Sequence, residues 1–230
     1  MILVEAPKFR KNLAWVTGGS KGIGLAISEC LIKNKQSVLG LNTEIMNLGN
    51  RKERRTWLAT QSDRPGILVL NAGVNTPLPF GEQSEEQFQE ILEINLLANR
   101  DLLLSVLPEM QKNKFGRIVF ISSLYATRAR EGRSAYSISK AGLEALARSI
   151  AVEYAAHGVL VNVVAPGFVR TSLTEKNNSS QDILKIESSI PLGRLADPEE
   201  IASVVSYLTS EQNTYITGQT IFVDGGLSIK

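Results

Sequence analysis

The chain has 230 residues, of which 43% are hydrophobic and 21% are charged, and its formal net charge is +2. This length and composition suit one globular domain over residues 1–230, and no linker or repeat divides a second one from it. A charge so near zero gives no reason to expect a nucleic acid or an anionic membrane as partner. No apolar run approaches the roughly 20 residues of a membrane span.

The chain contains one cysteine, Cys30, so an intrachain disulfide cannot form. Cys30 falls in a helical pattern, and we interpret it as a core thiol in a reducing compartment. The segment Met1–Leu13 has no apolar signal core, so we expect a cytoplasmic protein. With one histidine and one cysteine, we expect no transition-metal site.

Strand-like apolar runs alternate with helix-like runs along the chain. Near-continuous apolar strands between helices predict a parallel sheet that is covered on both faces. The predicted fold is therefore α/β, a single doubly wound parallel sheet (the Rossmann fold) with helices on both faces. The expected strands are Leu13–Val16, Val38–Leu41, Ile67–Leu70, Arg117–Ile121, Leu160–Val164 and Thr220–Val223, and the expected helices include Gly24–Asn34, Ser84–Glu109, Ala135–Ala156 and Pro198–Thr209.

The region around the third strand is shortened. Only nine residues, Asn42 to Asn50, separate the second strand from a helix-like stretch at Arg51–Thr60. A crossover to a parallel strand needs about a dozen residues or more, so Ile45–Leu48 cannot be an ordinary next strand. We expect a missing helix and a stunted or absent edge strand here.

The segment Thr17–Gly24 follows the first strand directly and opens a helix. Gly18, Gly22 and Gly24 allow a tight turn and a close approach of the backbone to a pyrophosphate. The free N–H groups at the start of the helix favour the phosphate charge. Three glycines could instead serve a purely structural turn, but their place after the first strand favours dinucleotide binding. The expected cofactor contacts in this loop are Gly18, Ser20, Lys21, Gly22, Ile23 and Gly24.

Tyr136 and Lys140 are four residues apart on a predicted helix, so their side chains share a face. A tyrosine phenol has a reference pKa of about 10, and a nearby cation such as Lys140 lowers it. Ser123 lies just past a strand end, where it can hold a substrate oxygen while Tyr136 transfers a proton. Taken alone, the same pair could equally be a solvated helix face.

Seven sequence features occur in the order typical of one family, and through them the chain resembles the short-chain dehydrogenase/reductase family from Leu13 to Gly226. They are Thr17–Gly24, Asn71-Ala72-Gly73, Asn95, Ser123, Tyr136 to Lys140, Pro166-Gly167 with Thr171, and Asp224-Gly225-Gly226. The resemblance implies a sheet of seven parallel strands and a homo-oligomer, either a tetramer or a dimer.

The same resemblance implies a role for each matching residue. Tyr136 would be the proton donor, Lys140 would hold the nicotinamide ribose, Ser123 would orient the carbonyl, and Asn95 would complete a water relay. Tyr136 as well as Lys140 is expected to contact the cofactor. On the cofactor, Asn71, Ala72 and Gly73 would support the adenosine side, and Pro166, Gly167, Val169 and Thr171 would hold the nicotinamide carboxamide. Asn47-Leu48 is the nearest equivalent of the family's adenine-side pair.

The choice between NADP and NAD depends on the end of the second strand. An acidic residue there would bind the ribose of NAD and repel a 2′-phosphate. Asn42 occupies this position and is uncharged, and Lys21 in the phosphate loop can meet a 2′-phosphate. We therefore favour NADP(H) over NAD(H), although Glu44 could supply the acidic group and Lys21 could be a solvated loop residue.

Arg133 lies three residues before Tyr136, and we expect it to bind substrate together with Ser123 and Tyr136. A guanidinium fits a carboxylate or phosphate, so an anionic or carrier-linked substrate is one hypothesis. The alternative is that Arg133 pairs with Glu131 or faces another subunit. The nearby Arg128 and Arg130 are interpreted as surface charge. The polar segment Thr171–Ile190 resembles the family's substrate lid, or else is an ordinary loop.

The sequence therefore predicts an NAD(P)-dependent oxidoreductase for a small carbonyl or alcohol, such as a carbonyl reductase similar to a 3-oxoacyl reductase. One alternative is a cofactor-binding regulator with the same fold and little catalysis, but the complete set of Ser123, Tyr136, Lys140 and Asn95 argues against it. A nucleotide-sugar epimerase is a second alternative, for which the chain is too short.

Overall fold

Six parallel strands form one sheet in the computed structural model, which describes residues 7–230. The strands lie in the order β2-β1-β3-β4-β5-β6. The doubly wound α/β class predicted from the sequence is confirmed. The strands are β1 (Lys8–Thr17), β2 (Ser37–Leu41), β3 (Asp63–Leu70), β4 (Gly116–Ile121), β5 (Val159–Pro166) and β6 (Thr220–Val223).

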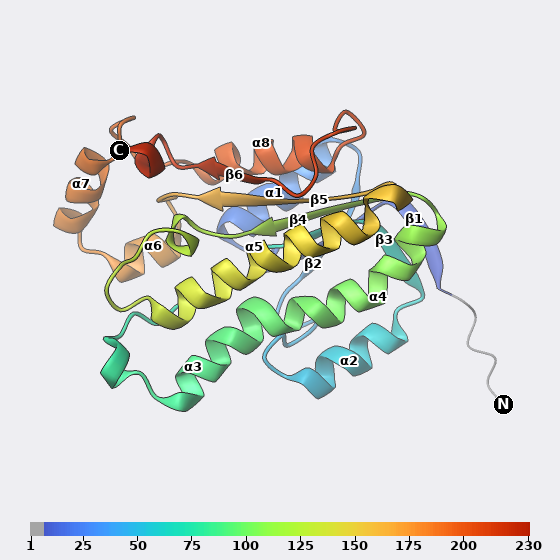
Figure 1. Ribbon diagram of the computed structural model, residues 1–230, viewed down its shortest axis with the longest axis horizontal. Helices are drawn as coiled ribbons and strands as arrows, with labels where there is room; N and C mark the ends of the chain where they lie inside the picture. The colour runs from blue at the N-terminus through green and yellow to red at the C-terminus, as the bar shows by residue number, and fades with distance from the viewer. Residues whose placement is uncertain (1–6) are drawn as a thin grey trace.

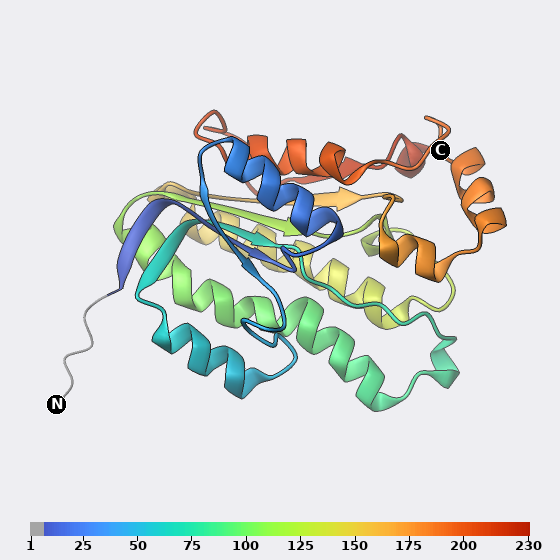
Figure 2. The ribbon, with the colours of Figure 1, turned by 180° about the vertical axis from the view of Figure 1, so that it is seen from behind.

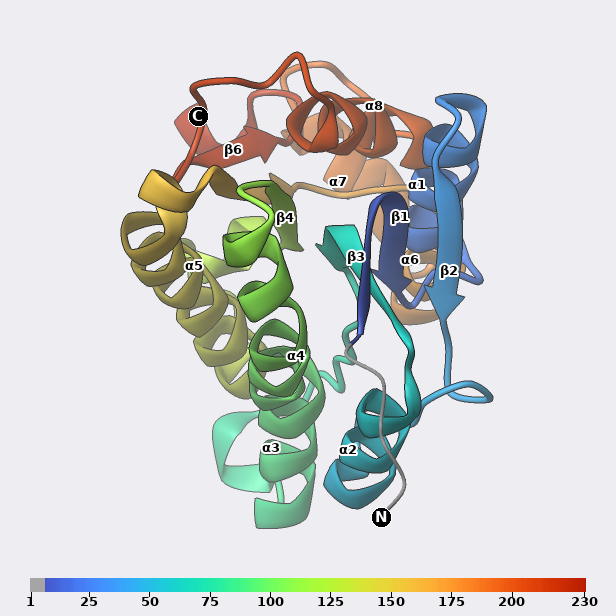
Figure 3. The same ribbon diagram turned by 90° about the vertical axis from the view of Figure 1, so that its right-hand side faces the viewer.

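Helices cover the sheet on both faces (Figure 1). The helices α1 (Gly22–Lys33) and α8 (Pro198–Thr209) pack on one face, which Figure 2 shows from their side. The helices α4 (Ala98–Lys112) and α5 (Ser134–Tyr154) pack on the other face. The end view in Figure 3 shows the sheet between these two layers.

The side chains of successive strand residues point to opposite faces of the sheet and pack into two separate hydrophobic cores. In β1, Leu13 and Trp15 pack with α4 and α5, whereas Ala14 and Val16 pack with α1 and α8. Side chains alternate between the two faces of a strand, so a strand covered on both faces must be apolar at every position. This is the physical reason why the central strands read as unbroken apolar runs.

The sheet ends at β2, and no strand or helix lies between β2 and α2 (Arg51–Thr60) in the structure. The segment 42–50 leads instead to α2, which lies beside α4 (Figure 3). Met46 and Leu48 of this segment are buried in the core beneath α4. The predicted loss of a helix and an edge strand is confirmed, and the sheet has six strands where the resemblance implied seven.

Arg54 of α2 fastens the shortened region to the rest of the protein. Its side chain is 1% exposed. The guanidinium donates to Asp101 from Nε at 3.0 Å and from Nη2 at 2.7 Å, to Glu93 at 2.7 Å, and to the carbonyl of Leu48. The Trp15 and Trp57 rings add an apolar contact between α2 and the sheet, with centroids 5.2 Å apart. Sequence reasoning missed this buried cation.

The long helix expected over Ser84–Glu109 is interrupted. The structure has α3 (Glu85–Leu92), a π-helical turn η2 (Glu93–Leu97) and then α4. A π turn inserts one extra residue per turn and commonly marks a functional site. The expectation of one continuous helix was wrong because hydrophobic periodicity does not reveal a local change of pitch.

One further expectation differs from the structure, and one alternative is excluded. Cys30 is partly exposed at the edge of the core rather than within it. The polar stretch after Thr171 forms two helices, α6 (Ser172–Asn177) and α7 (Ser180–Ser189), rather than a plain loop. The short helices η1 (Phe80–Glu82), η3 (Leu124–Ala126), η4 (Ala155–His157) and η5 (Leu227–Ile229) complete the fold.

Within residues 7–230, no helix is long and apolar enough to cross a membrane. The first half of the Met1–Leu13 segment, for which we expect no signal core, lies outside the described residues. The cytoplasmic location stays a prediction.

Candidate active site

The carboxyl ends of the six strands lie at one edge of the sheet because all the strands run parallel. This edge is on the left in Figure 1, where α6, α7 and the start of α5 gather. The phosphate loop follows β1, Asn71 follows β3, Ser123 follows β4, and Gly167 follows β5. The structure thus brings to one edge the segments that the sequence singled out separately.

The phosphate loop packs too closely to accept side chains at its glycines. A Cβ on Gly24 would lie 2.1 Å from the carbonyl oxygen of Gly18, and Gly18 itself has a φ of +66°. Helix α1 begins at Gly22, and its N-terminus has neither a side-chain cap nor an acidic residue in the first turn. Its first N–H groups and the positive end of the helix dipole suit the pyrophosphate of a dinucleotide.

Asn71 ties the end of β3 to this loop. Its Nδ2 donates to the carbonyl of Thr17 at 3.0 Å, and the backbone N–H groups of Asn71 and Ala72 both donate to the hydroxyl of Thr17, at 2.9 and 3.0 Å. Ser20 and Lys21 are exposed on the loop, and Ile23 is partly buried. Lys21 makes no ion pair with any described residue.

The loop after β5 lies beside the phosphate loop. A Cβ on Gly22 would be 3.4 Å from Cγ2 of Thr171, and Val169 is buried. Pro166 ends β5. A Cβ on Gly167 would come within 2.8 Å of Asp224, so the Asp224-Gly225-Gly226 motif packs directly behind this loop. The loop after β5 therefore lies against both the phosphate loop and the Asp224-Gly225-Gly226 motif.

Tyr136 and Lys140 lie on the first turns of α5 and share a face. The Nζ atom of Lys140 is 5.6 Å from the centre of the Tyr136 ring and donates to the carbonyl of Ile121 at 2.8 Å. Lys140 is 3% exposed. Burial lowers the pKa of the Lys140 ammonium to about 8. This excludes the solvated helix face that the pair could otherwise have formed.

Some groups around Tyr136 raise the pKa of its phenol and others lower it. Burial raises the pKa of its phenol above 10, while hydrogen bonding from Ser123 and the positive charge of Arg133 lower it. The Ser123 hydroxyl also accepts from the backbone N–H of Tyr125, which fixes its orientation at the end of β4. The net pKa of Tyr136 is raised and not lowered by Lys140 as the sequence predicted, because burial outweighs the nearby charge, so the phenol stays protonated near neutral pH.

Asn95 lies in the π turn and is fully buried. Its Oδ1 accepts from the N–H of Val74 at 2.8 Å, and its Nδ2 donates to the carbonyl of Val74 at 2.9 Å and to Ser139 at 3.1 Å. The side chain therefore links the loop after β3 to α5. Ser139 is a supporting residue that sequence reasoning missed, and its position next to Lys140 was the one available signal.

Gly73 leaves room for the two polar side chains at the centre of the site. A Cβ there would lie 3.3 Å from Oδ1 of Asn95 and 3.4 Å from Nζ of Lys140. The backbone after β3 thus runs directly past both groups. The neighbouring Asn75 has a buried Oδ1 with no partner among the described residues.

Asn42 lies at the end of β2, as the sequence predicts, but its side chain forms a local turn. Its Oδ1 accepts from the N–H groups of Glu44 and Ile45, each at 3.1 Å. Glu44 is exposed. The structure therefore places an uncharged turn residue next to the phosphate loop.

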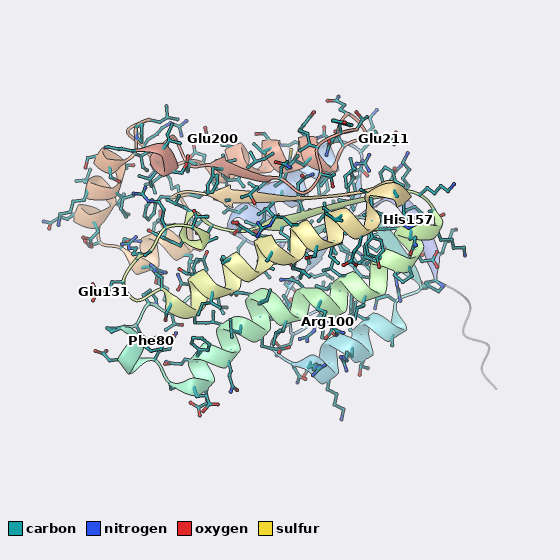
Figure 4. All side chains as sticks on the ribbon, viewed as in Figure 1. Phe80, Arg100, Glu131, His157, Glu200 and Glu211 are labelled. Atoms are coloured by element: carbon teal, nitrogen blue, oxygen red, sulfur yellow. The ribbon has the colours of Figure 1, made fainter. Side chains whose placement is uncertain are left out.

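Arg133 precedes α5 and is buried. Its guanidinium lies over the Tyr125 ring, 6.0 Å from the ring centre. It forms no ion pair with Glu131, which is exposed and is labelled in Figure 4 at the end of the molecule where α5 begins. Sequence reasoning did not single out Tyr125 as the surface on which Arg133 rests.

Together the doubly wound sheet, the cap-free α1 terminus and the paired Tyr136 and Lys140 define a nicotinamide-dependent oxidoreductase. The family model described as enoyl-(acyl carrier protein) reductase matches residues 20–228 of the chain. The 3-oxoacyl-[acyl-carrier-protein] reductase FabG of Rickettsia felis is 37% identical, over 92% of this chain and 95% of the relative.

Solved structures agree with these sequence matches. A short chain dehydrogenase/reductase family protein is 32% identical, with a TM-score of 0.86 over 95% of this chain and 97% of the other. A 4-hydroxyisoleucine dehydrogenase mutant complexed with NADH and succinate is 28% identical, with a TM-score of 0.88 over 95% and 99% of the two chains. The chain belongs to the short-chain dehydrogenase/reductase family and is an NAD(P)-dependent oxidoreductase.

Proposed function

We propose that this protein is a carbonyl reductase that uses NADPH to reduce the keto group of a 3-oxoacyl thioester held on a carrier. The observation that carries the proposal is the placement of Tyr136 and Lys140 on one face of α5, beside Ser123 and Asn95. The names of the relatives, 3-oxoacyl-[acyl-carrier-protein] reductases, support the choice of substrate.

In the proposed reaction, the reduced nicotinamide supplies a hydride to the carbonyl carbon. Ser123 donates a hydrogen bond to the carbonyl oxygen and orients it. Tyr136 then gives its phenolic proton to that oxygen, and the ketone becomes a secondary alcohol. The raised pKa of Tyr136 keeps the phenol protonated at neutral pH, so a proton is available when the carbonyl oxygen becomes basic.

Lys140 and Asn95 would stabilise the phenolate that remains when Tyr136 loses its proton and would help to replace that proton. The Lys140 ammonium stabilises the phenolate by its charge, since the two groups lie close together in a buried site. Lys140 would also hold the ribose next to the nicotinamide. Asn95 keeps the loop after β3 in place, and through a bound water it would connect Lys140 to solvent.

The remaining contacts would hold the cofactor. The residues we assign are Gly18, Ser20, Lys21, Gly22, Ile23, Gly24 and Asn42 for the phosphate side, Asn71, Ala72 and Gly73 for the adenosine side, and Pro166, Gly167, Val169 and Thr171 for the carboxamide. Lys21 and Asn42 support NADPH over NADH, because the exposed cation would attract a 2′-phosphate and no acid at the end of β2 would repel it.

We also propose a homo-oligomer, a tetramer or a dimer. Helices α4 and α5 lie side by side on one face (Figure 1), and each carries exposed apolar residues: Leu97 and Leu104 at α4, and Ile138 and Val152 on α5. Exposed apolar side chains gathered on one face are typical of interaction surfaces. The apparent mass in solution, measured by light scattering, checks this part of the proposal.

A turnover assay separates an enzyme from a cofactor-binding regulator. We would mix the purified chain with NADPH and the N-acetylcysteamine thioester of acetoacetate, and follow both cofactor oxidation and the 3-hydroxy product. The proposal predicts equal amounts of oxidised cofactor and alcohol, with slower turnover when NADH replaces NADPH. Binding of NADPH without turnover of this or any related 3-oxoacyl thioester would favour the regulator.

A further inference from the structure

The guanidinium of Arg133 is a buried cation without a protein partner. Its residue is 8% exposed, and its side chain forms no hydrogen bond or ion pair with any residue of the described range 7–230. Its nitrogen atoms are not among the fully enclosed unsatisfied atoms, so they face open space. A buried charge with no counter-charge is costly, and such a group calls for a ligand.

The surroundings of Arg133 are mainly cationic and aromatic, and the one acid that lines the same cavity, Glu131, is exposed and does not pair with Arg133. Burial lowers the pKa of the Arg133 guanidinium, and the like charge of Arg130 lowers it further. Arg130 is held away by its own contacts: it donates to the hydroxyl of Tyr125 at 2.6 Å and lies 5.7 Å from the Tyr125 and Phe168 ring centres. Two cations on one aromatic ring, neither of them in an ion pair with a described residue, favour an anion at this place.

The open space beside Arg133 is large enough for a small molecule. A cavity of about 520 Å³ is lined by Phe80, residues 125–134 and Ser137, and Arg133 is part of its wall. Arg133 is the N-cap residue of α5, three residues before Tyr136, and it rests on Tyr125, whose backbone N–H donates to the hydroxyl of Ser123. One molecule could therefore bind Arg133 at one end and present a carbonyl to Tyr136 at the other.

The guanidinium of Arg133 is planar and carries pairs of N–H donors that point in parallel. A guanidinium matches a carboxylate with two parallel hydrogen bonds, which a thioester carbonyl cannot accept. Because Arg133 forms part of the wall of a cavity, its ligand must be small or slender enough to enter that cavity. These features select a small ligand that carries its own carboxylate.

We propose that the site also accepts unesterified oxo acids, whose free carboxylate binds Arg133 while their ketone reacts at Tyr136. This inference rests on the proposed function for the chemistry at Tyr136. The reduction itself is unchanged: NADPH loses a hydride to the ketone carbon, Tyr136 gives a proton to the ketone oxygen, and NADP⁺ and a hydroxy acid result. The carboxylate forms and breaks no covalent bond.

The distance between Arg133 and the reacting carbonyl should select the chain length of the acid. Pyruvate, acetoacetate and levulinate carry their ketone one, two and three bonds from the carboxylate carbon. We would measure kcat/KM with NADPH for each acid and for its neutral methyl ester on the wild-type protein. The proposal predicts that at least one acid exceeds its own ester by about 10-fold or more, the scale of a charged hydrogen bond. If every ester equals or exceeds its acid, the proposal is wrong.

Substitution of Arg133 tests the same point by a second route. In Arg133→Gln the ratio of kcat/KM for the preferred acid to that for its ester should fall about 10- to 150-fold. Arg133→Lys should lose less, because it keeps the charge but not the paired N–H donors. The matched control is Arg148→Gln, which removes an equal charge from an exposed position further along α5, outside the cavity. This control should leave the ratio within about twofold of wild type, as an effect of distant charge alone would.

The outcomes separate this inference from the proposed function. If the protein reduces the acetoacetyl thioester but prefers no acid over its methyl ester, the role of Arg133 is wrong and the proposed function stands. Reduction of a free acid but of no thioester supports Arg133 and contradicts the carrier-linked substrate. If Arg133→Gln and Arg133→Lys both unfold, as judged by NADPH binding and thermal melting, the comparison of acids with esters on the wild type still decides.

Discussion

Lys140 donates a hydrogen bond from Nζ to the carbonyl oxygen of Ile121, 2.8 Å away. This carbonyl belongs to the last residue of β4, two residues before Ser123. The lysine is therefore oriented by a neutral backbone dipole and not by a carboxylate. Because the site is buried and lacks a counter-charge, the pKa of Lys140 falls to about 8.

The activity should decline as the pH rises through the pKa of Lys140. Below about pH 8 the ammonium is charged, and above it the proton is lost, together with the cation that steadies the Tyr136 phenolate and the ribose. The Tyr136 pKa is raised, so the phenol itself stays protonated over this range. We expect kcat/KM, with the cofactor varied at saturating substrate, to fall above about pH 8, since this parameter reports the free enzyme.

Lys140→Arg is the control for this profile. Arginine remains charged throughout, so the variant should be slower but should lack the decline near pH 8. A wild-type profile that stays flat between about pH 7 and 10 would show that Lys140 does not govern the reaction.

Arg54 should be essential for stability although it lies outside the site. Its removal leaves Asp101, Glu93 and the carbonyl of Leu48 without their shared donor. Breaking a buried ion pair by removing one partner costs about 3–5 kcal/mol. We expect Arg54→Met to lose about that much free energy of unfolding in urea, and Arg54→Met with Asp101→Leu to recover part of it. Arg55→Met, an exposed pair with the same carboxylate, should cost under about 1 kcal/mol.

The same pair gives the stability a dependence on acid. Burial alone would raise the pKa of Asp101, but hydrogen bonds and charges from Arg54 and Arg55 outweigh it and hold the pKa below its ordinary value. Asp101 therefore contributes stability above the ordinary carboxyl pKa of about 4, and this contribution is lost as the pH falls through its lower folded value. In Arg54→Met, the free energy of unfolding should therefore decrease less as the pH falls than it does in the wild type.

The cofactor preference is tested by titrating NADPH and NADH against the fluorescence of the protein-bound cofactor. We expect NADPH to bind more tightly, because Lys21 is exposed at the phosphate loop and Asn42 is uncharged. Lys21→Ala should weaken the binding of NADPH by about 1.5–3 kcal/mol, the contribution of a hydrogen bond to a charged group. The binding of NADH should stay nearly unchanged. Equal affinities in the wild type, or equal losses in the variant, would count against this preference.

The sequence predicted the sheet and the site because both depend on local patterns. The apolar runs reveal strands buried on two faces, and nine residues between Leu41 and Arg51 are too few for another helix and strand. The motif residues could be placed in one site because the ends of parallel strands must meet at one edge. The spacing of Tyr136 and Lys140 on one helix predicts their shared face, whereas Asn95 was predicted only by the family resemblance.

Features that depend on tertiary packing could not be predicted. Arg54 lies on a polar helix, and nothing in its neighbours indicates that it is buried beside Asp101. The polar start of β1, from Lys8 onward, pairs with Asp63–Pro65 of β3 and lacks the apolar signal of a strand. The contact of Arg133 with Tyr125 likewise depends on how one loop folds back on itself.

The most direct test of the central claim is the reduction rate of Tyr136→Phe compared with its affinity for NADPH. The phenylalanine ring can still pack, so the variant should bind NADPH nearly as tightly as the wild type. Without the phenolic proton, kcat for the acetoacetyl thioester should fall by about 10²–10⁴-fold. A variant that binds NADPH normally and keeps more than about a tenth of the wild-type kcat would contradict the assignment of Tyr136 as the acid.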